Sequence, residues 1–170
     1  MHFERVKLEA FKHDMMSYRP INFMSGEVDR AYAAIKIPQR KTIASAGYDI
    51  CTPIDITIPP GQRRVIPTGI KAVFEKDELE TWHLQMYVRS SVGIKDGIVL
   101  TNGTGIIDSD YQFAENDGDM MLALLNTSDS TVKYKAGDRL CQAVFCIHGV
   151  TSDDNATGHR RGGVGSTGRR

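Results

Sequence analysis

Alternating hydrophobic and polar positions divide most of the chain after residue 30 into short strands. Residues 82–89 alternate regularly, which places four apolar side chains on one face: Trp82, Leu84, Met86 and Val88. Residues 54–58 also alternate, and residues 140–148 are apolar nearly throughout, as is typical of a strand buried on both faces. Turn sequences separate these segments: Pro59-Pro60-Gly61, Asp96-Gly97, Asn102-Gly103 and Lys135-Ala136-Gly137-Asp138. Many short strands with tight turns predict an all-β fold, such as a sandwich, jelly roll or barrel.

Helical periodicity is scarce along the chain. Residues 4–17 predict a helix with apolar side chains loosely on one face, and residues 75–80 predict a single helical turn. From Ser152 onward the sequence is polar and glycine-rich without periodicity, which predicts a flexible arm. We therefore expect an amino-terminal extension of unclear role (1–30), a β-rich core (31–152) and a carboxy-terminal arm (153–170).

Composition narrows the classes of function. The 170 residues suit one domain, and 21 Lys and Arg balance 21 Asp and Glu, which argues against a broad basic face for stable binding of nucleic acid. No segment approaches the roughly 20 apolar residues of a membrane span, and the first residues lack a signal peptide, so we expect a cytoplasmic protein. The three cysteines, Cys51, Cys141 and Cys146, lie in apolar runs and are expected to be small buried thiols rather than metal ligands.

The end of the arm has the spacing of a phosphate-binding loop. Gly163, Gly165 and Gly168 form G-x-G-x-x-G, but only Arg169 and Arg170 follow, so no helix can present its amino terminus to an anion. Such a segment could close over a phosphate as a lid, with backbone N–H groups, the hydroxyls of Ser166 and Thr167, and charge from Arg160 or Arg161. A solvated basic tail is the alternative reading of the same residues.

Four further segments, together with the arm, decide between these readings. In chain order the five segments are Ala46-Gly47-Tyr48-Asp49-Ile50, Arg89-Ser90-Ser91-Val92-Gly93, Gly105-Ile106-Ile107-Asp108-Ser109-Asp110-Tyr111, Gly137-Asp138-Arg139-Leu140-Cys141-Gln142, and Arg161-Gly162-Gly163-Val164-Gly165-Ser166-Thr167-Gly168. They resemble the five motifs of the trimeric dUTP pyrophosphatases (dUTPases) of bacterial or phage type, over residues 38–168.

The resemblance implies a jelly-roll subunit, a homotrimer whose active sites combine three chains, and an arm that covers a neighbour's nucleotide. It implies hydrolysis of dUTP to dUMP and pyrophosphate, which limits uracil in DNA and supplies dUMP for dTMP synthesis. Asp108 matches the aspartate that orients and deprotonates the attacking water. Tyr111 matches the tyrosine that packs against the deoxyribose and leaves no room for a 2′-hydroxyl.

The same resemblance assigns the other contacts of the nucleotide. Residues 99–107 correspond to a β-hairpin that pairs with the uracil edge. Asp49 matches a first-motif aspartate that acts on Mg²⁺ indirectly through water, while the three phosphates would hold most of the ion. The substrate-binding residues implied besides Tyr111 are Arg89, Ser90, Ser91, Gly93, Asn102, Gly105, Ile107, Gln142, Arg161, Gly163, Val164, Gly165, Ser166 and Thr167.

Three departures from the family pattern stand out. Val164 occupies the place of a phenylalanine that stacks on uracil, which predicts either weaker substrate binding or a substitute aromatic such as Phe113. Residues 112–119 form an acidic insertion that we expect to be an exposed loop. Residues 1–30 precede the family's usual start and suggest an extra helix or a partner surface.

Two alternatives remain at this point. Deoxycytidine triphosphate deaminase resembles the same fold, but it needs a glutamate in the strand after the third motif, and residues 120–128 contain no acidic side chain. A nucleotide-gated regulatory protein that binds a protein partner is the other alternative, because residues 1–30 and 112–119 offer spare surface.

Overall fold

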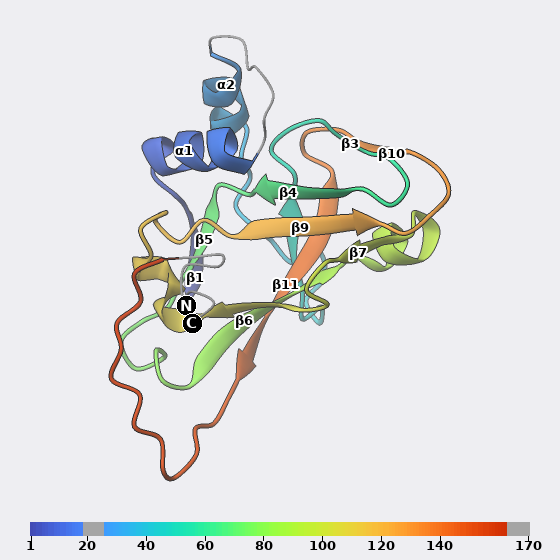
Figure 1. The fold of residues 1–170 in the computed structure, drawn as a ribbon. Helices are drawn as coiled ribbons and strands as arrows, with labels where there is room; N and C mark the ends of the chain where they lie inside the picture. The colour runs from blue at the N-terminus through green and yellow to red at the C-terminus, as the bar shows by residue number, and fades with distance from the viewer. Residues whose placement is uncertain (19–25, 163–170) are drawn as a thin grey trace.

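The computed structural model describes residues 1–18 and 26–162, and their eleven strands form four antiparallel sheets (Figure 1). The largest sheet has the order β2-β11-β6-β8 (Tyr48–Cys51, Arg139–Ile147, Trp82–Val88, Gly105–Asp108), and the second has the order β4-β9-β7 (Arg63–Pro67, Met121–Asn126, Ile98–Leu100). Two smaller sheets pair β1 with β5 (His2–Arg5, Ile70–Val73) and β3 with β10 (Ile56–Ile58, Val132–Tyr134). The all-β prediction is confirmed.

The helices are few and short. They are α1 (Leu8–Tyr18), α2 (Glu27–Ala33), a π-helical turn η1 (Ser91–Lys95) and a 3₁₀ turn η2 (Ser109–Phe113). Residues 76–81 form consecutive turns instead of the expected helical turn, because only isolated bonds such as Glu78 N–H to the Glu75 carbonyl close there. Within the described ranges, no helix has the length and hydrophobicity to cross a membrane.

The hydrophobic core lies between the two larger sheets, which cross each other in Figure 1. Leu84 and Met86 of β6 are fully buried, together with Leu122 and Leu124 of β9, while Tyr87 on the other face of β6 is exposed. The alternation read from residues 82–89 is thus confirmed, because every second side chain of the strand enters the core.

Strand β11 departs from the expected burial on both faces. Leu140 and Cys141 are consecutive buried residues, but the side chains from Val144 to Cys146 are only half-buried. The reason is the topology: β2 pairs with β11 only as far as Ala143, and the rest of β11 pairs with β6 alone. Cys141 is therefore a buried thiol, whose pKa burial raises to about 12, whereas Cys51 and Cys146 are half-buried.

The first eighteen residues pack as part of the core. His2–Arg5 forms β1 and pairs with β5, so the helix expected from residue 4 begins only at Leu8. Phe11 and Met15 of α1 are fully buried, and Phe11 lies under Gly69, where an added Cβ would come within 3.1 Å of its ring. Within the predicted extension, residues 1–18 thus form a strand and a helix that complete the core.

The acidic insertion, residues 112–119, is only partly exposed, contrary to the expectation of an exposed loop. Ala114, Gly118 and Asp119 are buried. Asp117 adopts a φ of 57° and its carboxylate accepts the Lys7 backbone N–H at 2.7 Å and the Lys71 ammonium at 3.3 Å. The insertion is therefore a compact turn held against the start of α1 and against β5, which charge alone could not indicate.

The buried carboxyl of Asp119 makes the stability of the folded protein depend on pH. Its carboxylate accepts the Gly69 N–H at 2.8 Å through Oδ1, while the buried Oδ2 has no partner among the described residues. Burial, with the nearby Asp14 carboxyl adding to it, raises the pKa of Asp119 well above its usual value. The folded chain therefore holds a proton that the unfolded chain loses near pH 4, so the contribution of Asp119 to stability declines as pH rises above that value.

We expect Asp119→Asn, which cannot ionise, to gain stability relative to the natural protein as pH increases from 4 to 7. Urea unfolding at several pH values measures the difference in free energy of unfolding between the two proteins. A difference that stays constant with pH would contradict the assignment of a neutral, buried Asp119.

Candidate active site

One group of predicted site residues gathers where β2, β11 and β6 lie side by side. Asp49 of β2 forms an ion pair with Arg89, at 3.0 Å from its Nε atom, and accepts an N–H of Arg139 at 2.9 Å. Gln142 of β11 is paired with Asp49 on one side and with Tyr87 on the other. Because one carboxylate faces two guanidinium groups, this arginine–aspartate cluster carries a net positive charge suited to an anion.

Close packing fixes the cluster. A Cβ on Gly47 would lie 2.7 Å from Oε1 of Gln142, so only glycine lets the first-motif backbone approach the Gln142 side chain this closely. The backbone N–H of Arg89 donates to the Leu140 carbonyl at 2.9 Å, and the Gly93 N–H donates to the Arg89 carbonyl. Arg89 is therefore held at the junction of β6 and η1.

The two residues after Arg89 are serines that lie at the surface, Ser90 and Ser91. Both residues are exposed, and their hydroxyl groups have no hydrogen-bond partner among the described residues. Hydroxyl donors beside a guanidinium that is already oriented by Asp49 are available to an incoming phosphate.

Asp108 lies at the other end of the sheet. It ends β8 opposite His83 of β6, and its carboxylate is about half-exposed. The Arg160 guanidinium donates to Asp108, and its Nε–H donates to Asp110 at 2.6 Å. Burial disfavours the charge on Arg160, but the hydrogen bonds and attraction to Asp110 and Asp108 outweigh that effect and raise the pKa of the guanidinium.

The arm thus reaches the chain's own Asp108. It runs from β11 along the outside of the molecule and returns to η2 (Figure 1). The Glu115 N–H donates to the Arg161 carbonyl at 3.0 Å, so Arg161 is placed here through its backbone while Arg160 supplies the charge. Gly163, Val164, Gly165, Ser166 and Thr167 lie outside the described residues.

Tyr111 lies directly beneath this contact. The Arg160 guanidinium lies 5.8 Å from the centre of its ring, and only 7% of Tyr111 is exposed. Its hydroxyl donates to the Asp119 carbonyl at 2.9 Å and accepts from Asn116 at 3.0 Å. Burial raises the pKa of Tyr111 to about 12, so the phenol stays neutral across the physiological range.

The segment expected to form a hairpin differs in its pairing. Asn102 is exposed at a tight turn that the Gly103 N–H closes onto the Leu100 carbonyl, at a φ of 75° that favours glycine. However, β7 pairs with β9 and β8 pairs with β6, so the two arms belong to different sheets. Gly105 is buried against Met86, and Ile107 is half-buried on β8.

The two groups of residues are far apart within one chain. Asp108 lies opposite His83, whereas Arg89 follows the last residue of β6, so roughly 20 Å of strand separates the two. A water-activating carboxylate and the groups that bind the attacked phosphate must lie within contact of the same triphosphate. One chain alone therefore does not bring the predicted residues into a single site.

Two arginines that the resemblance did not assign to the site belong to these groups. Arg139 completes the arginine–aspartate cluster, and Arg160 is the arm residue whose side chain reaches Asp108 and Asp110. Arg139 stood inside the fourth motif, but nothing in its spacing indicated a pairing with Asp49, ninety residues away. Arg160 and Arg161 were equivalent in the sequence, and only the fold distinguishes them.

Comparisons with known proteins identify the family. A family model described as dUTPase matches residues 33–168. A deoxyuridine 5′-triphosphate nucleotidohydrolase from Lactococcus lactis is 41% identical over 139 residues, which cover 80% of this chain and 90% of the relative. The chain belongs to the dUTPase family.

Further relatives agree with this dUTPase assignment. A nucleotidohydrolase of the same name from Haemophilus ducreyi is 34% identical over 162 residues, covering 91% of this chain and 99% of the relative. The crystal structure of a dUTPase from Streptococcus mutans has a TM-score of 0.66 at 28% identity, covering 91% of this chain and 100% of the other. The jelly-roll-like fold is confirmed, and the comparisons favour the dUTPase over the deaminase relative and the regulatory protein.

Proposed function

We propose that this dUTPase hydrolyses dUTP to dUMP and pyrophosphate, with Asp108 as the base that activates water. The observation that carries the proposal is the half-exposed Asp108 carboxylate, held by Arg160 at the end of β8, in the third of the motifs that resemble those of the family. The carboxylate would orient the water and accept its proton as the oxygen attacks phosphorus. Attack on a triphosphate is opposed by negative oxygens, so positioning and charge neutralisation supply most of the catalysis.

The arginine–aspartate cluster would bind the phosphates. Arg89 and Arg139 provide positive charge, and the hydroxyls of Ser90 and Ser91 provide neutral donors beside them. Asp49 fixes both guanidinium groups, so the donors are oriented before the substrate arrives. Gln142, held against Gly47, would add an amide donor to the phosphates or their waters.

Magnesium fits this arrangement as an ion carried by the substrate. Among residues 1–18 and 26–162, no three His, Cys, Asp or Glu side chains lie close enough together to hold a metal ion, so the phosphates would supply most ligands. Asp49 could accept hydrogen bonds from water bound to the ion. Bound Mg²⁺ would supply charge neutralisation at the triphosphate.

The separation of the two residue groups supports a homotrimer. Since Asp108 and Arg89 lie at opposite ends of β6, copies of the chain would have to bring one chain's Asp108 to another chain's cluster. Apolar side chains next to these groups are available for contact between copies: Ile94 is 84% exposed and Ile106 is 52% exposed. Residues 163–168 would close over the nucleotide in the assembled site.

Pyrophosphate release from dUTP with Mg²⁺, measured beside dCTP, dTTP and UTP, tests the proposal. Release from dUTP alone supports the reaction and its base specificity. Release from no nucleotide, by protein whose trimeric state has been checked by light scattering, would refute it.

Two substitutions test whether Phe113 is the aromatic residue that stacks on uracil. Phe113 is 65% exposed at the end of η2, two residues beyond Tyr111, so its ring is free to stack on a base. We expect Phe113→Ala to raise the KM for dUTP about fivefold, since an aromatic stack contributes about 1 kcal/mol. Val164→Phe would then leave KM nearly unchanged. If Val164→Phe lowers KM and Phe113→Ala has no effect, Phe113 does not replace the missing aromatic.

A further inference from the structure

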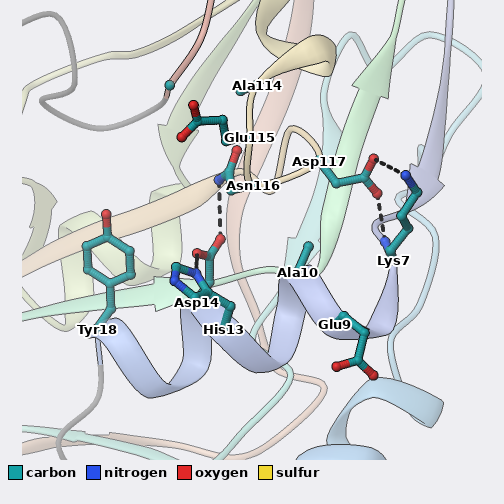
Figure 2. A pocket seen from close by; sticks show the side chains of 11 residues that line it. Lys7, Glu9, Ala10, His13, Asp14, Tyr18, Ala114, Glu115, Asn116 and Asp117 are labelled. Atoms are coloured by element: carbon teal, nitrogen blue, oxygen red, sulfur yellow. Dashed lines mark hydrogen bonds and ion pairs between the residues drawn. The ribbon is translucent and has the colours of Figure 1, made fainter.

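The two segments that the family pattern leaves unexplained meet beside Tyr111. Helix α1 and the turn of residues 114–117 face each other across a pocket of about 670 Å³, which Figure 2 shows from close by. The pocket is lined by Lys7, Glu9, Ala10, His13, Asp14, Tyr18, Ala114, Glu115, Asn116, Asp117 and Gly162. Its two walls are connected at two places: Lys7 and Asp117 pair near the start of the helix, and Asp14 of α1 and Asn116 of the turn point toward one another.

Asn116 connects this pair to Tyr111. Its side-chain amide donates to Asp14 Oδ2 at 3.2 Å, to the Tyr111 hydroxyl at 3.0 Å and to the Asp119 carbonyl at 3.1 Å. The Tyr111 hydroxyl in turn donates to the same Asp119 carbonyl at 2.9 Å. The phenol is therefore held by two partners, and both belong to the turn of residues 114–119.

The side-chain amide of Asn116 provides both the acceptor and the donors that its neighbours require. Its oxygen accepts the Gly118 N–H at 3.2 Å and so shapes the turn, while the two N–H groups of its nitrogen are shared among three acceptors. An aspartate would keep the acceptor for Gly118 but lose every donor, and it would place a second carboxylate beside Asp14, which is only 3% exposed.

Asp14 anchors the network on the helix. Neighbouring residues Phe11 and Met15 are fully buried, so α1 is fixed against the core and Asp14 cannot move independently of it. The acceptor for Asn116 is thus supplied by a rigid element. Through Asn116, the position of the Tyr111 ring depends on Asp14 of α1, which precedes Asn116 by 102 residues.

We propose that Asn116 and Asp14 are positioning residues that set the selectivity of this enzyme for deoxyribose over ribose. The inference rests on the proposed packing of Tyr111 against the sugar. A ring excludes a 2′-hydroxyl only if it cannot retreat, because a mobile ring gives way to one extra atom. The hydrogen bonds from Asn116 hold the ring in place, and Asp14 holds Asn116.

The test is the ratio of kcat/KM for dUTP to kcat/KM for UTP. This ratio is measured on one preparation, so the fraction of correctly folded protein cancels and a loss of stability alone does not change it. We expect Asn116→Asp to lower the ratio about tenfold, mainly through a higher KM for dUTP and a higher kcat/KM for UTP. Glu115→Gln is the matched control, because the adjacent Glu115 side chain has no partner among the described residues, and its ratio should stay at the natural value.

A double variant distinguishes positioning of Tyr111 from a general effect on the turn. Tyr111→Phe removes only the hydroxyl and should lower the ratio to a similar extent. If Asn116 acts through that hydroxyl, Tyr111→Phe combined with Asn116→Asp will lower the ratio no further than either single variant. If the double variant lowers the ratio by the product of the two single effects, the two residues act independently and the proposal is overturned.

Tyr111→Ala separates this inference from the function on which it rests. If Tyr111→Ala lowers the ratio but Asn116→Asp leaves it within twofold of the natural value, the sugar contact stands and the positioning role is refuted. If Tyr111→Ala leaves the ratio unchanged, the sugar contact fails, and the role of Asn116 and Asp14 fails with it. Hydrolysis of dUTP itself is unaffected by either result.

Discussion

Replacing Asp108 with Asn is expected to lower kcat for dUTP hydrolysis by a factor of about 10³ while the nucleotide still binds. Removing a positioned general base costs typically 10²–10⁴ in rate, and the amide keeps the size of the carboxylate but cannot accept the proton of water. The half-exposed Asp108 carboxylate makes no contact with the arginine–aspartate cluster, so substrate affinity should change little. Rapid-quench measurement of dUMP formation, beside calorimetric titration with a non-hydrolysable dUTP analogue, gives both quantities.

Asp110→Asn is the matched control for this experiment. Both carboxylates are partners of Arg160, and both are about half-exposed, but only Asp108 ends β8 at the position that the third motif assigns to the base. Asp110→Asn should keep kcat within a few-fold of the natural value. If Asp110→Asn loses as much activity as Asp108→Asn, the assignment of Asp108 as the base is contradicted. The two carboxylates would then matter because their ion pairs hold Arg160, and not because one of them accepts a proton.

The strands and most of the motifs could be predicted from the sequence because their signals are local. Alternation along residues 82–89 depends only on which side chains face the core, and the structure reproduces it in Leu84 and Met86. The turn at Gly103 likewise follows from a residue that tolerates positive φ. These features need no knowledge of which strands pair.

The errors concern contacts between segments distant in the chain. The sequence predicted a helix from residue 4 because a helical pattern of apolar residues gives no sign that His2–Arg5 pairs with β5. Residues 112–119 read as exposed because their acidic side chains suggested solvent, whereas Asp119 is bonded to Gly69 and Asp117 to Lys7 and Lys71. Backbone N–H groups of Gly69 and Lys7 and the Lys71 ammonium, all far away in the sequence, hold these carboxylates, and no spacing rule predicts such contacts.

Because the sequence shows local motifs but not distant contacts, only some of the site residues were predicted. Asp49, Arg89, Asp108 and Gln142 lie in short motifs, so resemblance located them, and the structure then grouped three of them around one charge cluster. Arg139 became a candidate only through its partner far away in sequence, and only such partners distinguished Arg160 from Arg161. Asn116 lies in none of the five motifs, and its importance rests on three hydrogen-bond contacts that only the structure shows.

Phe11→Ala provides the largest expected effect on stability. We expect the variant to lower the free energy of unfolding by about 3–5 kcal/mol, the usual cost of removing a fully buried phenylalanine ring. The ring packs 5.8 Å from the Tyr32 ring and beneath Gly69, so its loss leaves a cavity between α1, α2 and the end of β4. Urea unfolding followed by tryptophan fluorescence, at one fixed protein concentration, measures the change.

Met16→Ala on the same helix is the control for Phe11→Ala. Met16 is 76% exposed, and methionine and alanine both favour helix, so this variant should stay within about 0.5 kcal/mol of the natural protein. A loss of less than about 1 kcal/mol in Phe11→Ala would mean that α1 is a loosely attached extension. In that case Asp14 could not act as a fixed anchor for Asn116, so the stability of this helix and the proposed selectivity for deoxyribose depend on the same packing.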